Sequence, residues 1–219
     1  MPEIALFPLH VVLFPHMPLE LHVFEPRYRA MLRDCEATRT SFGVIAIRRG
    51  SEVGGEAEPH AVGTLARIEK VERLPTGAVT LQVAGTARFQ VVHAGRRRPY
   101  PVAEIAYLPD RVEDEAEARS LAQTALRSFG AYAGILRQLA DRPDTSAAAL
   151  PEDPELLSYL IAATLAVELP AKQRLLEAAS TVERLREALR LLRRERTLLE
   201  HQLAPPVLTG LRPPRQSPN

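Results

Sequence analysis

The sequence contains no tryptophan, one cysteine and only two lysines among its 219 residues. The single cysteine, Cys35, cannot form an intrachain disulfide, so we expect a reducing compartment. No apolar run approaches the roughly 20 residues that cross a bilayer. No basic segment precedes an apolar run as it does in a signal peptide. These absences predict a cytoplasmic protein with no membrane partner.

An excess of charge of one sign is also missing. The 28 basic and 27 acidic residues leave a formal net charge of +1. This balance argues against a strongly electrostatic partner such as bulk duplex DNA, although a local basic patch is still allowed. Hydrophobic residues make up 46% of the chain, as in ordinary globular proteins. The length suits one large domain or two small ones.

The sequence lacks the common catalytic motifs. Neither Lys70 nor Lys172 follows a glycine, so there is no Walker-type G-K-[ST] element, and there is no G-x-S-x-G elbow. Cysteine–histidine catalysis would depend on Cys35 alone, whose place late in a helical segment is typical of a small buried residue. We therefore predict a protein that is not an enzyme and has no cofactor. An enzyme acting on a small ligand in a cleft is the least supported alternative.

Three histidines recur at even spacing, namely His10, His16 and His22. Even spacing could place three imidazoles on one face of a strand, as in a metal site. Pro15 and Pro18 interrupt that strand, because proline removes a donor from the ladder. We therefore predict no metal site here.

Residues 1 to about 108 have the pattern of short strands. Apolar or alternating runs such as FGVIAIR, AVGTLARIEKVERL and PVAEIAYL are separated by turn residues such as PTGA. The residues after Pro26 instead have helical spacing as far as about Thr38, and proline suits the first helical position. One helix among six or seven strands predicts a small closed or partly closed barrel over residues 1–110.

The second half of the chain has helical composition. No proline occurs from Val112 to Leu139, where alanine, leucine, arginine and glutamate dominate. Asp153 before Pro154 predicts another helix start, and a further helix is expected near Pro170. The S-x-x-E sequence from Ser180 to Glu183 has the form of a capping box before a last long helix.

These patterns predict a helical domain over residues 111–203 and a disordered tail, rich in proline, over residues 204–219. The last helix carries an apolar stripe made of Val182, Leu185, Leu189, Leu192, Leu199 and Leu203. Such a stripe could join two copies in a homo-oligomer. With other helices close by in sequence, we favour an intramolecular core.

The densest basic segment is Arg96, Arg97 and Arg98, followed closely by Tyr100. Arginines beside an aromatic ring could contact RNA, and arginines alone could contact phosphate or an acidic peptide. The simpler interpretation is a solvated turn between two strands, which we favour because the chain as a whole is not basic.

Several motifs occur in an order and spacing that point to one family. FPLHVVLFPHMPLELHVFEPRYRAML is followed by FGVIAI, VGTLARIEKV and GTARFQV, and later by KQRLLEAASTVERLREALRLLRRE. In combination they resemble the N-terminal substrate-recognition domain of the Lon proteases. The resemblance implies an α+β fold with a PUA-like β pseudo-barrel followed by a C-terminal helical bundle. In that family the region contributes to recognition of protein substrates and to assembly.

Lon proteases continue into an ATPase module and a Ser–Lys peptidase module, and this sequence ends without either. We therefore expect a free-standing, non-catalytic module that recognises unfolded or specific polypeptides and hands them to a separate protease or chaperone. An RNA-binding PUA-like protein is the alternative, and it is based on analogy between folds.

Matching Glu25 to the F-E-P-R-Y pattern of this family suggests a structural clasp. A carboxylate at a helix N-terminus meets unpaired N–H groups and the positive end of the helix dipole. We expect Glu25 to pair with Arg88 on the facing strand, so that Glu25→Gln lowers thermal stability. Loss of ligand binding at an unchanged melting temperature would instead make Glu25 part of a site.

A module that recognises unfolded chains needs exposed apolar surface. We predict this surface at Leu13, Phe14 and Met17 in the proline-bent segment, with Tyr100 at the far end of the sheet. The alternative is that all four side chains belong to the core.

Overall fold

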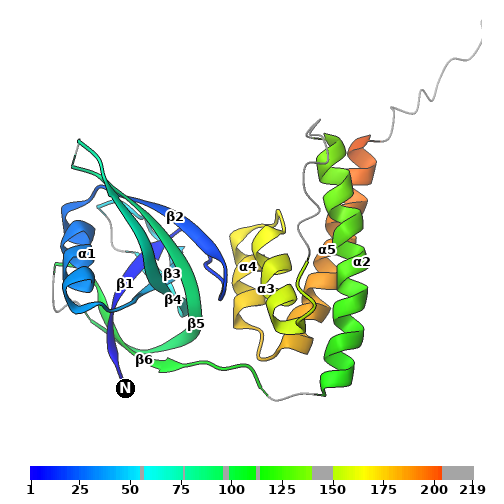
Figure 1. The fold of residues 1–219 in the computed structure, drawn as a ribbon, viewed down its shortest axis with the longest axis horizontal. Helices are drawn as coiled ribbons and strands as arrows, with labels where there is room; N and C mark the ends of the chain where they lie inside the picture. The colour runs from blue at the N-terminus through cyan, green and yellow to red at the C-terminus, as the bar shows by residue number, and fades with distance from the viewer. Residues whose placement is uncertain (55–56, 76, 96–98, 112–113, 140–149, 204–219) are drawn as a thin grey trace, which may run out of the picture.

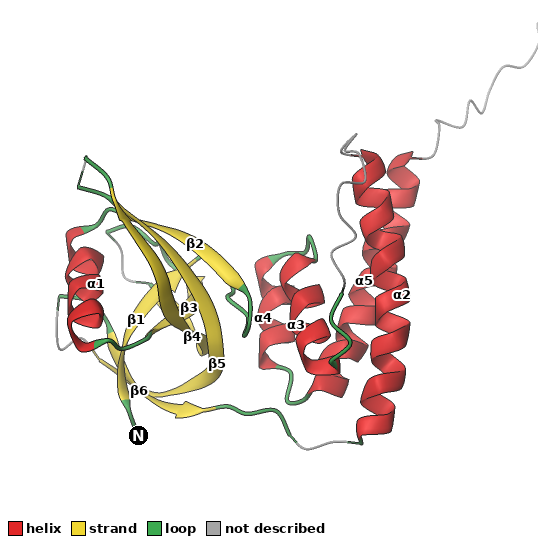
Figure 2. Ribbon diagram, viewed as in Figure 1, coloured by secondary structure: helices red, strands yellow, loops and turns green. Residues whose placement is uncertain are grey.

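The computed structural model describes residues 1–54, 57–75, 77–95, 99–111, 114–139 and 150–203. The fold is mixed α/β, with strands gathered on one side and most helices on the other (Figure 1, Figure 2). The elements, in order, are β1 (Glu3–Leu9), β2 (Pro18–Val23), α1 (Pro26–Thr38), β3 (Phe42–Arg49), β4 (Glu58–Arg73), β5 (Val79–Gly95), β6 (Val102–Tyr107), α2 (Glu115–Leu139), α3 (Pro154–Thr164), α4 (Leu169–Glu177) and α5 (Thr181–Leu203). The predicted tail over residues 204–219 lies outside the described residues.

The six described strands form one sheet in the order β2-β5-β4-β3-β1-β6, and β5 also pairs with β6. The second pairing closes β5, β4, β3, β1 and β6 into a ring, called the barrel below. Only β1 and β3 run parallel, with Leu6 opposite Gly43, and the other pairs are antiparallel. Register shifts interrupt the pairing of β4 with both of its neighbours, and such irregularities bend a strand.

Helix α1 covers one side of the barrel (Figure 1). It begins at Pro26 and ends at Thr38, as the sequence predicts, and Arg39 follows in the left-handed conformation with φ 53°. Its buried face, Tyr28, Met31, Leu32 and Cys35, packs against barrel residues such as Phe7 and Phe42. Helical spacing after Pro26 therefore places apolar residues over the barrel.

Helices α3 and α5 begin where the sequence places their caps. The Asp153 carboxylate accepts the Leu156 N–H at 2.8 Å at the start of α3. At the start of α5 the Ser180 hydroxyl accepts the Glu183 N–H at 3.2 Å, and the Glu183 carboxylate accepts the Ala179 N–H at 3.0 Å. These bonds satisfy N–H groups that a helix start leaves unpaired.

The predicted leucine stripe of α5 is an intramolecular core. Leu185, Leu189 and Leu192 are buried among residues of α2, α3 and α4, and Val182 is buried as well. Helices α2 and α5 run side by side in the same direction (Figure 1), and the Arg186–Glu117 ion pair joins them near their N-terminal ends. The homo-oligomer predicted as the alternative therefore cannot use this part of the stripe.

Helix α4 connects the helices to the barrel (Figure 1). The buried amide of Gln173 in α4 donates to the Val62 carbonyl of β4 at 3.0 Å. One apolar cluster contains Phe14 and Val62 from the barrel side together with the buried faces of α2 to α5. The barrel and the helices therefore share a core as well as a covalent connection.

Candidate functional site

The four side chains predicted to form an exposed peptide-binding surface lie in the core. Leu13, Phe14, Met17 and Tyr100 expose 3%, 1%, 9% and 1% of their surface. The prediction of an exposed surface at these residues is wrong, and the alternative that all four are core residues is confirmed.

The segment around Phe14 packs closely against Gly85 of β5, which turns Phe14 inward. The His16 N–H donates to the Gly85 carbonyl and the Gly85 N–H donates to the Met17 carbonyl, both at 2.9 Å. A Cβ at Gly85 would lie 2.1 Å from the Phe14 carbonyl oxygen, so only glycine permits this close approach. The prolines therefore bend the segment into the fold and not out to solvent.

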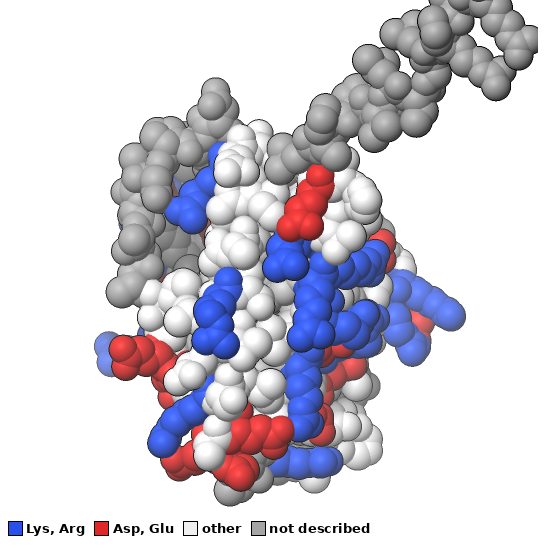
Figure 3. All heavy atoms as spheres, turned by 90° about the vertical axis from the view of Figure 1, so that its right-hand side faces the viewer, with Lys and Arg blue, Asp and Glu red and all other residues white. Residues whose placement is uncertain are grey.

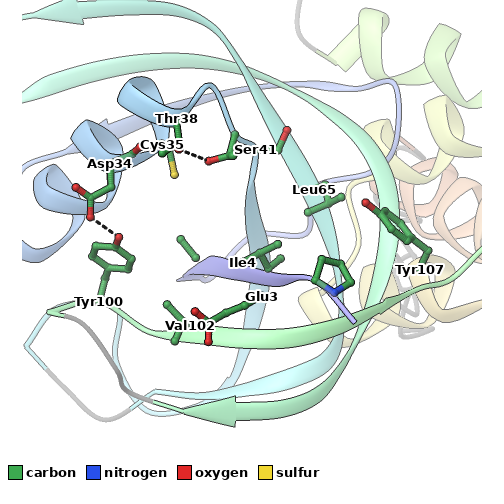
Figure 4. Close-up of a pocket in the computed structure, with 13 residues that line it drawn as sticks. Glu3, Ile4, Asp34, Cys35, Thr38, Ser41, Leu65, Tyr100, Val102 and Tyr107 are labelled. Carbon is green, nitrogen blue, oxygen red and sulfur yellow. Dashed lines mark hydrogen bonds between the residues drawn. The ribbon is translucent and has the colours of Figure 1, made fainter.

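The Tyr100 ring is buried, and its hydroxyl points to the exposed Asp34 side chain. Its hydroxyl donates to the Asp34 carboxylate at 2.5 Å (Figure 4). A buried ring cannot stack on a base, so the aromatic part of the predicted RNA surface is absent. Arg96, Arg97 and Arg98, the basic part, lie outside the described residues.

The predicted clasp between Glu25 and Arg88 does not form. Glu25 precedes α1 with no side-chain bond to the helix N–H groups, and its carboxylate accepts the Arg27 Nε–H at 3.0 Å. Arg88 points toward the helices, where it donates to the backbone carbonyls of Leu176 and Ala178 at 2.7 and 2.6 Å. Arg88 therefore caps the C-terminal end of α4, where a cation is favourable.

The carboxylate that holds the two halves together is Asp110, just after β6. It forms an ion pair with Arg88 from the barrel, and it accepts bonds of 2.8 to 3.0 Å from the Arg184 guanidinium of α5. The Thr181 and Tyr159 hydroxyls donate to it at 2.9 and 3.3 Å. We call these five residues the Asp110 network, and it replaces the predicted clasp.

Two cations share one carboxylate in this network, and the surroundings offset the excess charge. The Arg88 and Arg184 side chains are 1% and 0% exposed. Arg184 also donates to the Ser158 hydroxyl at 3.0 Å and lies 3.9 Å from the centre of the Tyr159 ring. Burial raises the pKa of Tyr159 to about 12, although both arginines oppose that shift. The phenol is therefore held neutral and acts as a donor.

Asp110 and Arg184 are not among the site residues predicted from the sequence. Arg184 occupies a position of α5 that is buried together with Ala188 and Leu191, one and two turns further along. In the sequence, this arginine lies on the same helix face as apolar residues, which indicates that it is buried. A buried guanidinium requires hydrogen-bonding or charged partners. The identity of the partner was not available, because Asp110 lies 74 residues away.

A groove opens on the barrel beside the start of β1, called the β1 groove below. Its volume is about 470 Å³, and its lining includes Ile4, Asp34, Ser41, Tyr100 and Tyr107. Figure 4 shows Asp34 and Tyr100 facing each other at one end, with Tyr107 at the other. Tyr107 is 62% exposed. The β1 groove therefore offers an aromatic ring and hydroxyl groups to a ligand.

A second groove, of about 490 Å³, lies between α1 and the hairpin that joins β4 to β5. We call it the α1–hairpin groove. Its apolar residues include Leu32, Leu74 and Val79, and its charged residues are Arg29, Arg33, Glu36 and Arg73. It therefore combines an aliphatic floor with a positive rim.

The outer face of α2 and α5 carries a column of basic side chains (Figure 3). The exposed side chains of α5 include Arg186, Arg190, Arg193 and Arg194. Arg190 donates to Glu187 at 2.6 Å, and this hydrogen bond lowers the pKa of Glu187. Because acidic residues pair with part of the column, we interpret it as a solvated helix face.

The described residues contain no group of three or more His, Cys, Asp or Glu side chains placed to hold a metal ion. His10, His16 and His22 are all exposed. Cys35 is buried and lies against the β1 groove. Among the described helices, none is both long and apolar enough to cross a membrane.

Comparison with known proteins identifies the family. The family model described as the ATP-dependent protease La (LON) substrate-binding domain matches residues 3–194. The chain belongs to the LON substrate-binding domain family. The resemblance proposed from the sequence is therefore confirmed, and this domain accounts for most of the chain.

Members of the LON family with known names include full-length Lon proteases. The Lon protease of Roseiflexus castenholzii is 33% identical over 202 residues, which are 90% of this chain and 25% of that protein. The Lon protease of Azorhizobium caulinodans is 30% identical over 191 residues, 87% of this chain and 22% of that protein. The chain thus spans about a quarter of the length of these relatives.

Solved LON structures show the same fold. The Lon N-terminal domain protein from Xanthomonas campestris has a TM-score of 0.64 and 28% identity, covering 87% of this chain and 98% of that one. The N-terminal domain of the Mycobacterium avium complex Lon protease has a TM-score of 0.68 at 17% identity, covering 88% and 98%. The second likeness concerns the fold alone.

Proposed function

We propose that this protein is a non-catalytic module that binds unfolded or specific polypeptides. The observation that carries the proposal is the match of the LON substrate-binding domain model to residues 3–194. The barrel, which we take to be PUA-like, offers two open grooves to an extended chain. The buried ionisable groups of the Asp110 network support the proposal, because they bind one another and stabilise the fold.

The chemistry of the grooves supports polypeptide binding. Each combines aliphatic or aromatic side chains with hydrogen-bonding groups, which is the composition of peptide-binding clefts. The proposal places the protein in the cytoplasm, where it passes bound chains to a separate protease or chaperone. It requires no cofactor and no bond cleavage by the module itself.

The proposal is tested with a permanently unfolded, fluorescently labelled reporter protein and the folded form of the same reporter. Fluorescence anisotropy should rise with the unfolded reporter alone, and electrophoresis after long incubation should show it intact. Absence of binding to the unfolded reporter would refute polypeptide recognition. Cleavage of the reporter by purified protein would refute the non-catalytic part.

A second experiment separates protein partners from RNA. The tagged protein is captured from mildly crosslinked native lysate, and half of the sample is treated with nuclease. Proteins retained equally in both halves support the proposal and identify a protease or chaperone by mass spectrometry. Loss of all partners after nuclease treatment would favour RNA binding.

A further inference from the structure

The α1–hairpin groove has an excess of positive charge on its rim. Arg73 is paired with Glu36 at 2.7 Å, which leaves Arg29 and Arg33 without a carboxylate partner among the residues that line the groove. Arg33 is exposed, and no ion pair or hydrogen bond joins its side chain to another described residue. Two guanidiniums next to each other attract an anion, and their planar forks suit a carboxylate.

The walls of the groove are held apart at a fixed width. Arg29 donates through Nη1 to the Gly77 carbonyl at 3.1 Å, and Gly77 adopts a φ of +79° that favours glycine. The Arg73–Glu36 ion pair makes a second bridge from the hairpin to α1. Arg29 has five N–H donors and uses one in this bond, so it can hold the hairpin and still bind a ligand. The groove is therefore organised before a ligand arrives, which lowers the entropic cost of binding.

The floor of the groove selects against a purely ionic ligand. Leu32 of α1 is 2% exposed and Val79 of β5 is 8% exposed, so the floor belongs to the packed core between α1 and the barrel. Leu74, 39% exposed, extends the aliphatic surface onto the rim. No aromatic side chain is among the described residues that line the groove, although single-stranded RNA is bound largely by base stacking on aromatic rings. The combination favours a polypeptide over a nucleic acid.

We propose that the α1–hairpin groove binds a polypeptide segment in which an acidic side chain lies beside aliphatic side chains. The carboxylate is bound by Arg29 and Arg33, and the aliphatic groups pack on Leu74 at the rim. This inference rests on the proposed function and specifies one sequence class that the module prefers.

The test uses a labelled glycine–serine peptide that contains one aspartate between two leucines. Two control peptides replace the aspartate by asparagine or both leucines by serine. Either replacement should weaken binding about tenfold. The asparagine peptide loses one charge-assisted hydrogen bond, and the serine peptide loses the apolar contacts of the two leucines. Arg33→Gln should weaken binding of the aspartate peptide by a similar factor and leave binding of the asparagine peptide unchanged, because the two changes remove the same contact.

The matched control is Arg193→Gln, which removes an exposed arginine from α5, far from the groove. It should leave the affinity for the aspartate peptide unchanged. Because Arg33 is exposed and its side chain makes no bond to another residue that the structure describes, Arg33→Gln should also keep the wild-type melting temperature. Leu74→Ser changes a side chain on the rim and tests the aliphatic contact independently. It should weaken binding of the aspartate peptide by several fold.

The outcomes separate this inference from the function on which it rests. If the unfolded reporter binds but Arg33→Gln changes the affinity for neither the aspartate peptide nor the asparagine peptide, polypeptide recognition stands and the groove assignment is overturned. If neither reporter nor peptide binds, both are overturned. If single-stranded RNA binds instead, and Arg33→Gln abolishes that binding, the groove is an RNA site and the peptide proposal is wrong.

Discussion

Asp110→Asn is the sharpest test of how the barrel is held against the helices. The substitution keeps the size of the side chain and one acceptor oxygen. It removes the charge that faces Arg88 and Arg184, and it brings an NH2 donor toward groups that are themselves donors. Two guanidiniums that are at most 1% exposed then lose their carboxylate.

The size of the effect follows from burial. Breaking a buried ion pair by removing one partner costs about 3–5 kcal/mol, because the remaining charge stays desolvated. For a protein of this size each kcal/mol lowers the melting temperature by about 2–4 °C, so the expected fall is roughly 6–20 °C. Thermal unfolding followed by circular dichroism, together with urea unfolding at neutral pH, measures both quantities.

The control removes a charge where water can replace the partner. Glu69→Gln breaks the Arg67–Glu69 pair, whose side chains are 64% and 46% exposed, and it should cost about 1 kcal/mol or less. A loss below about 1 kcal/mol for Asp110→Asn as well would refute the reasoning. Coupling with Arg88→Met gives a second check, because the double variant should lose less than the sum of the single variants.

Three further predictions concern other residues. Tyr159 has a pKa raised from 10.0 to about 12. Its contribution to the free energy of unfolding is therefore fully present below pH 10 and is lost as the pH rises through 12. That loss amounts to about 3 kcal/mol, and Tyr159→Phe should remove this alkaline component from urea unfolding curves. Glu25→Gln breaks only the partly exposed pair with Arg27, so calorimetry should show a loss of about 1 kcal/mol or less. Phe14→Ser should unfold the protein in thermal scans, since truncating a buried phenylalanine costs about 3–5 kcal/mol. A folded Phe14→Ser variant that had lost only peptide binding would contradict the core assignment.

Local features of the fold could be predicted because each depends on neighbouring residues. Pro26 and the spacing of Tyr28, Met31 and Leu32 set the bounds and the buried face of α1. Asp153 marks the start of α3 because its cap bond reaches only three residues ahead. Helix caps and apolar periodicity are short-range, so the sequence displays them directly.

The orientation of Phe14 could not be predicted in the same way. Prolines interrupt the alternation around it, so the pattern does not say which side chains face inward. The deciding contact is the close approach of the Phe14 backbone to Gly85, and Gly85 is distant from Phe14 in the sequence. The same limit applies to Arg88, whose partner was predicted as Glu25 and is Asp110. A buried cation shows that a partner exists but does not identify it.

The closed ring of strands also determines when the barrel can fold. Strand β1 pairs with β6 through Glu3 and Glu104, and β2 pairs with β5 through Val23 and Val79. These contacts join distant parts of the chain, and such long-range pairing slows folding. During synthesis the first strand has no partner on this edge until β6 has left the ribosome, so it is exposed to other chains for that interval.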